Sequence, residues 1–142
     1  MAEREVVIQQ GDLFWVTFGS GRGSEPWGRR PALILQHDRF NRSRLNTVVV
    51  VAITSNLRYA SLPGNVRLRK SEGKLPKTCV ANVAQIQTID RAYLIQKIGT
   101  LPRHLLRRVW DGVRLASSRS RRIDYQAEVN LPGVHPHLCP LP

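Results

Sequence analysis

The chain has 142 residues, enough for one domain with a modest hydrophobic core. Its 22 lysines and arginines outnumber its 10 acidic residues, and the formal charge of +12 favours a nucleic acid or an acidic protein as partner over a merely solvated basic surface. The longest apolar run, 48–53, is too short for a transmembrane helix, and the N-terminus lacks a signal-peptide pattern, so we expect a soluble, cytoplasmic protein with no membrane partner.

Short apolar segments separated by turns predict a mainly β protein. Residues 47–54, TVVVVAIT, are nearly all β-branched and are expected to form a strand buried on both faces. Pro31 is expected at the first residue of its strand, where proline is tolerated. A polar, arginine-rich turn with one helical turn is expected at 38–44. In chain order, the predicted strands are 13–18, 31–36, 47–54, 65–69, 78–88 and 93–98.

One helix is expected late in the chain. Pro102 favours a helix start, and the apolar residues after it recur at helical spacing, namely Leu105, Leu106, Val109, Trp110 and Val113. Their shared face is expected to pack on the sheet. Short strands followed by one helix predict a small, strongly bent antiparallel barrel formed by residues 1–117. Residues 118–142 are predicted to be a basic, proline-containing tail with poor order.

Several residues carry ordinary structural expectations. Trp15 and Cys79 lie within strand patterns and are expected in the core, Cys79 as a small buried hydrophobe. His37 ends a strand with no acid paired to it in the pattern, so it is expected to be a surface residue. No spacing of cysteines and histidines resembles a zinc site, and no metal or cofactor is predicted.

The segment GRRPALILQ at 28–36 is the strongest functional signal. Arg30 precedes a proline at the mouth of an apolar strand, and Thr54 ends the next long strand. A fixed guanidinium near a hydroxyl is an arrangement that can hold one phosphodiester. The pattern therefore favours chemistry on a nucleic-acid backbone.

A glycine-rich, basic loop at 19–30 precedes this strand and is expected to be mobile. Within it, Arg22 is a candidate phosphate contact, and Glu25 could instead pair with Arg22. Arg29 is either a surface charge or an RNA contact. Trp27 could stack on a base or cover the mouth of the barrel.

These segments together resemble the MazF/PemK family of toxin endoribonucleases, in family order over roughly residues 10–116. The quoted segments that carry the resemblance are GDLFWV at 11–16, GSEP at 23–26, RRP at 29–31, NTVVVV at 46–51, ITSN at 53–56, LPGNV at 62–66 and QIQTID at 85–90. Each segment is weak alone, but the ordered set is specific.

The resemblance implies an SH3-like barrel, a homodimer and metal-independent cleavage of single-stranded RNA at short sequences. It also implies a cognate acidic, MazE-like antitoxin that occupies the RNA groove. Expected products carry 2′,3′-cyclic phosphate and 5′-hydroxyl ends. The resemblance gives Arg30 and Thr54 as the catalytic pair. The candidate RNA contacts are Arg22, Ser24, Glu25, Trp27, Arg29, Ser55, Asn56, Gln85 and Gln87.

The sequence departs from the family at two positions of the QIQ segment. Several relatives carry an acid before the glutamine that matches Gln85, where this chain has Ala84, and several carry an arginine where this chain has Gln87. The general base is therefore left unassigned. Two other functions stay open at this point, a barrel toxin that inhibits DNA gyrase and a non-catalytic RNA-binding barrel.

Overall fold

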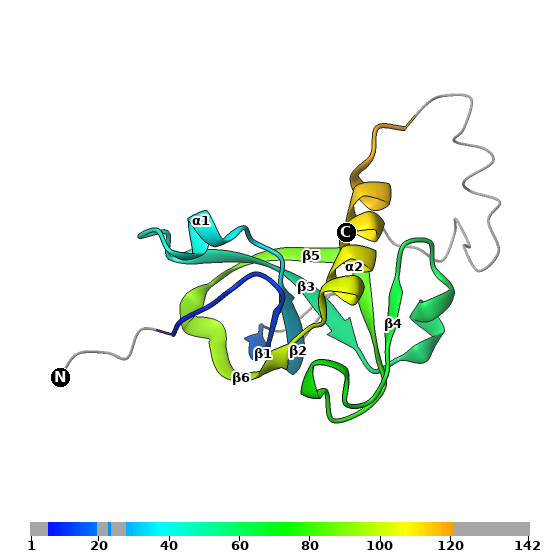
Figure 1. Cartoon of the computed structure of the whole chain (residues 1–142), viewed down its shortest axis with the longest axis horizontal. Coiled ribbons are helices and arrows are strands. Elements are labelled where there is room, and N and C mark those ends of the chain that lie inside the picture. The colour runs from blue at the N-terminus through cyan, green and yellow to red at the C-terminus, as the bar shows by residue number, and fades with distance from the viewer. Residues whose placement is uncertain (1–5, 20–22, 24–27, 121–142) are drawn as a thin grey trace.

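The computed structural model describes residues 6–19, 23 and 28–120. Within these residues, six antiparallel strands form one sheet in the order β4-β5-β3-β2-β1-β6. Figure 1 shows this sheet curled into a half-barrel, with α2 lying across one face. The strands are β1 (Asp12–Phe18), β2 (Gly28–Ile34), β3 (Thr47–Thr54), β4 (Val66–Leu68), β5 (Cys79–Asp90) and β6 (Leu94–Thr100); the helices are α1 (Asp38–Asn41) and α2 (Arg103–Ser117), and the 3-10 turns are η1 (Leu57–Ser61), η2 (Glu72–Lys74) and η3 (Arg91–Tyr93).

The prediction of a mainly β, strongly bent antiparallel sheet with a C-terminal helix is confirmed. The β3 strand has the predicted bounds, and its side chains alternate between two separate cores because successive strand residues point to opposite faces. One core, on what we call the helix face, contains Leu33, Val51, Ile53, Ala81 and the α2 residues Leu105, Val109 and Val113. The other core, on what we call the site face, contains Phe14, Val16, Ala32, Ile34, Val48 and Val50.

Strand β2 begins three residues earlier than predicted and ends two residues earlier. Gly28 pairs with Phe18 and Arg30 pairs with Val16, so pairing with β1 extends the strand into the glycine-rich segment. Pro31 is thus an interior residue of β2, contrary to the prediction that it begins the strand. Proline is tolerated there because the ladder between β2 and β3 begins only at Ala32, so β2 is paired on one side at Pro31.

A buried carboxylate links β1 to the edge strand β6 through a hydrogen bond and an ion pair. Asp12 is the first residue of β1 and is fully buried. Its side chain accepts hydrogen bonds from the Gln9 N–H and the Thr100 hydroxyl, each at 2.9 Å, and Lys97 Nζ lies 3.4 Å away. A buried charge of this kind is stable because its partners replace lost water.

The prediction for Cys79 is also confirmed. Its side chain is buried in the core of the helix face, and burial raises the pKa of its thiol, which keeps the sulfur protonated at neutral pH.

Helix α2 is seated very close to the turn before β4. A Cβ added to Gly112 would lie only 2.0 Å from the carbonyl oxygen of Gly64, so neither the helix nor the turn has room for a side chain at that point. This close approach fixes the turn that carries Asn65. Within the described residues, no helix combines the length and apolar character needed to cross a membrane.

Candidate active site

Arg30 and Thr54 lie on neighbouring strands at matching positions. The last aligned pair of β2 and β3 is Ala32 with Ala52. Arg30 stands two residues beyond that pair on β2, and Thr54 stands two residues beyond it on β3. Because side chains alternate along a strand, both project from the site face, as Ala32 does.

The immediate neighbours of this pair are apolar and fully buried. Val16 on β1 is paired with Arg30, and Val80 on β5 is paired with Thr54. Arg30 and Thr54 themselves are half-buried. A guanidinium above buried apolar side chains acts in a lower effective dielectric than one in water, which strengthens its attraction for an anion.

The Thr54 hydroxyl has one defined hydrogen bond. Its Oγ1 accepts the backbone N–H of Asn56 at 3.1 Å. Because the oxygen is used as an acceptor, the hydroxyl proton remains available for donation to a phosphate oxygen. Asn56 in turn caps η1, where its Oδ1 accepts the Arg58 N–H at 3.1 Å.

The remaining predicted contacts lie around this pair. Ser55 and Asn56 are exposed directly after β3. Gln87 on β5 is half-buried and paired with Val50, so it projects from the site face. Gln85 is also half-buried and lies in an irregular part of β5, where the register with β3 jumps between Ile86 and Asn82.

Two asparagines stabilise this irregular segment through hydrogen bonds. The sequence predicted no role for either of them. Buried Asn82 accepts the Asn65 side-chain amide and the Ala84 N–H, both at 3.3 Å. Asn65 accepts the Val83 N–H at 2.9 Å and donates to the Tyr59 carbonyl at 2.9 Å. Asn65 lies in the quoted LPGNV segment, which was the only sequence signal for it.

We expect Asn65→Ala to destabilise the protein by about 2 kcal/mol, because it leaves the N–H of the buried Val83 without its partner. It should also lower activity more than its stability loss alone would, since Gln85 follows the segment that Asn65 holds. Urea unfolding and cleavage rates measured well below the midpoint separate the two effects. Wild-type stability in Asn65→Ala would contradict this assignment.

Arg29 and Arg30 point to opposite faces of the sheet. The Arg29 guanidinium lies 5.1 Å from the ring centroid of Trp15, in cation–π geometry. The prediction that Trp15 is a core residue is therefore wrong, since the ring is half-buried beneath an exposed arginine. The candidates in the preceding loop, Arg22, Ser24, Glu25 and Trp27, lie outside the described residues.

His37 is exposed, as predicted, and its Nδ1 accepts the Arg39 N–H at 3.0 Å, where it caps α1. Across residues 6–19, 23 and 28–120, no three His, Cys, Asp or Glu side chains gather as metal ligands would. Among the predicted site residues, the polar groups that project from the site face are the Arg30 guanidinium, the Thr54 hydroxyl and the Gln87 carboxamide, which is paired with Val50 farther along β3.

Comparison with known proteins identifies the family of this chain. The family model described as "PemK-like, MazF-like toxin of type II toxin-antitoxin system" matches residues 9–117. The chain belongs to the PemK/MazF toxin family. The match includes both Arg30 and Thr54 and ends where α2 ends.

Named relatives of the chain in the PemK/MazF family are endoribonucleases. Endoribonuclease MazF2 of Mycobacterium bovis and endoribonuclease MazF6 of Mycobacterium tuberculosis are each 39% identical over 109 residues, 77% of this chain and 96% of theirs. Endoribonuclease MazF of Staphylococcus saprophyticus is 36% identical over 92 residues, 65% of this chain and 76% of its own.

Solved structures share the fold of this PemK/MazF chain. MazF of Deinococcus radiodurans superposes with a TM-score of 0.66 and 24% identity, covering 78% of this chain and 96% of its own. A MazE–MazF structure from the same organism gives a TM-score of 0.64, also at 24% identity, and covers 82% of this chain and 100% of its own.

Proposed function

We propose that this chain is the toxin endoribonuclease of a type II toxin–antitoxin system and cleaves single-stranded RNA at short specific sequences without a metal ion. The observation that carries the proposal is the alignment of Arg30 with Thr54 on one face of the sheet, within a region that matches the family from residue 9 to residue 117. The protein would then act in the cytoplasm, where its RNA substrate lies.

The proposed reaction uses the nucleophile that RNA itself carries. The 2′-hydroxyl gives up its proton to a base that is left unassigned, and its oxygen attacks the adjacent phosphorus. The bond from phosphorus to the 5′-oxygen breaks, and the departing oxygen takes up a proton. The products are a 2′,3′-cyclic phosphate and a 5′-hydroxyl. Arg30 neutralises the charge that develops on the phosphoryl oxygens, and the Thr54 hydroxyl donates to one of them. Ala84 and Gln85 carry no carboxylate, so neither is proposed as the base.

The partners follow from the same family membership. We propose that the chain acts as a homodimer and is neutralised by an acidic, MazE-like antitoxin that covers the site face. MazE–MazF structures from Deinococcus radiodurans and a mycobacterial endoribonuclease in complex with its cognate antitoxin are among the structural neighbours and support this proposal. The chain's charge of +12 favours an acidic partner.

The test is incubation of the purified protein with a diverse pool of single-stranded RNA in excess chelator, followed by sequencing and chemical mapping of the new ends. We expect cuts within a short shared sequence and cyclic phosphate ends. An RNA substituted with 2′-deoxy at the cut position should stay intact, because it lacks the nucleophile. A fully intact pool would refute the endoribonuclease proposal, and inhibition of gyrase by the same sample would favour the gyrase alternative.

A further inference from the structure

Arg67, on the edge strand β4, lies in the same cross-strand row as Thr54. Arg67 is paired with Val80 on β5, and Val80 is paired in turn with Thr54 on β3. The row therefore runs across four neighbouring strands, from Arg67 through Val80 and Thr54 to Arg30. We call it the phosphate row.

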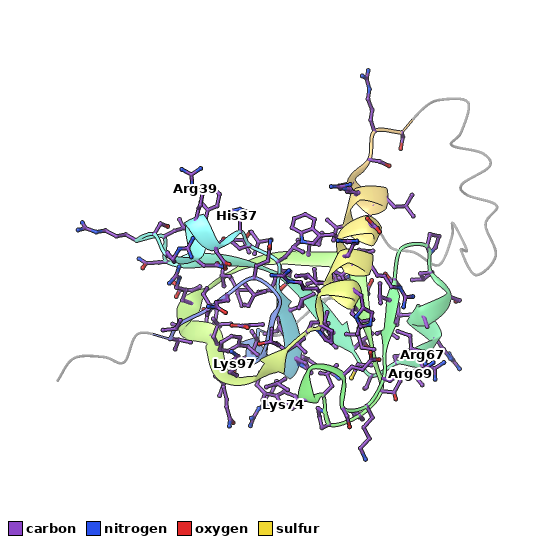
Figure 2. All side chains as sticks on the ribbon, in the orientation of Figure 1. His37, Arg39, Arg67, Arg69, Lys74 and Lys97 are labelled. Atoms are coloured by element: carbon purple, nitrogen blue, oxygen red, sulfur yellow. The ribbon has the colours of Figure 1, made fainter. Side chains whose placement is uncertain are left out.

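Arg67 projects from the site face. Its neighbours Val66 and Leu68 are buried in the core of the helix face, so the side chain between them points the other way. Arg67 is exposed, and Figure 2 shows it beside Arg69 at the β4 edge, both directed away from the body of the protein. In the part of the chain that the structure describes, no carboxylate forms an ion pair with Arg67.

Arg69 is the weaker candidate of the two. Its backbone N–H donates to Glu72 Oε1 at 2.8 Å, which places a carboxylate beside it. Among the described residues, no hydrogen bond or ion pair joins Arg67 to a carboxylate, and its register is closer to the site. An exposed arginine in this position suits a phosphate oxygen, which it can hold through two N–H donors.

The spacing of the row suits one nucleic-acid strand. Neighbouring strands are about 4.8 Å apart, so the Arg67 backbone is about 10 Å from that of Thr54. A single-stranded RNA with its scissile phosphate at Arg30 and Thr54 spans this gap within one or two nucleotides. The guanidinium of Arg67 then meets a second phosphate of the same strand.

We propose that Arg67 binds a phosphate one or two nucleotides from the scissile one and thereby positions the RNA along the phosphate row. This inference deepens the proposed function and rests on it. The ligand is the backbone of single-stranded RNA, so Arg67 contributes to affinity and alignment without reading base identity.

The test compares Arg67→Gln with Arg107→Gln, which removes an equal charge from an exposed residue of α2, the helix on the opposite face. Binding is measured by fluorescence anisotropy on 2′-O-methyl RNA, which cannot be cleaved, over a range of salt concentrations. Arg67→Gln should weaken binding about tenfold and reduce the slope of log affinity against log salt by about 0.7. Arg107→Gln should leave that slope unchanged.

A cleavage assay separates this inference from the proposed function. On long RNA, Arg67→Gln should lose about tenfold in kcat/KM. On an oligonucleotide trimmed to the nucleotides on either side of the cut, its kcat/KM should equal that of the wild type, because this substrate lacks the second phosphate. The inference would be overturned if Arg67→Gln bound RNA with wild-type affinity and an unchanged salt slope, and only its binding of an acidic peptide were weakened. Wild-type protein that cuts no RNA would instead refute the proposed function, whatever the binding of Arg67→Gln.

Discussion

Arg30→Ala should reduce RNA cleavage by about two to three orders of magnitude, the usual loss when one preorganised donor to a transition-state oxyanion is removed. Arg30 is half-buried and paired with the fully buried Val16, so water screens its charge less than that of a fully exposed arginine. The measurement is the single-turnover rate at saturating RNA, with circular dichroism and size-exclusion chromatography to confirm an intact fold and the proposed dimer.

Arg30→Lys is the matched control, because it keeps the charge but loses the planar fork. We expect it to recover only part of the rate, which distinguishes two-point binding of phosphate from simple charge neutralisation. A cleavage rate in Arg30→Ala equal to that of the wild type would place the active site elsewhere.

Thr54→Val should lower the cleavage rate about 10- to 100-fold while keeping the shape of the side chain. The variant removes the hydroxyl that we assign to a phosphate oxygen, and it also removes the acceptor for the Asn56 N–H. Thr54→Ser retains the hydroxyl and should stay close to wild type. The comparison uses single-turnover rates of the three proteins on one RNA, together with their melting temperatures.

Equal rates for Thr54→Val and wild type would show that the hydroxyl takes no part in the reaction. A loss in Thr54→Ser alone would point to the methyl group and its packing instead.

Much of the fold follows from residue pattern alone. The 47–54 segment is so rich in β-branched residues that its bounds match β3, and the apolar spacing after Pro102 gave the helix and its packing face. The bounds of β2 did not follow, because glycine and arginine at 28–30 are poor strand signals. Their strand conformation comes from pairing with β1, a long-range contact that local propensity does not contain.

Trp15 shows the same limit for side chains. Its segment is strand-like and mostly buried, which predicts a core residue, but alternation turns the ring to the helix face in the middle of β1, where Arg29 covers it. No pattern in one sequence specifies that an exposed arginine will cover an aromatic ring.

The candidate site was predicted in part. Arg30 and Thr54 were proposed from the ordered motifs, and the register of β2 against β3 gives them matching positions on one face of the sheet. Arg67 and Asn82 could not be found in this way. Their relation to Thr54 depends on β5 lying between β3 and β4, a strand order that differs from the order in the chain.

The most direct test of the account is a crystal structure of the protein with an RNA whose cut position carries a 2′-O-methyl group. We predict two N–H groups of Arg30 and the Thr54 hydroxyl at about 2.7–3.0 Å from oxygens of the phosphate at that position. A scissile phosphate bound away from both side chains would contradict the account.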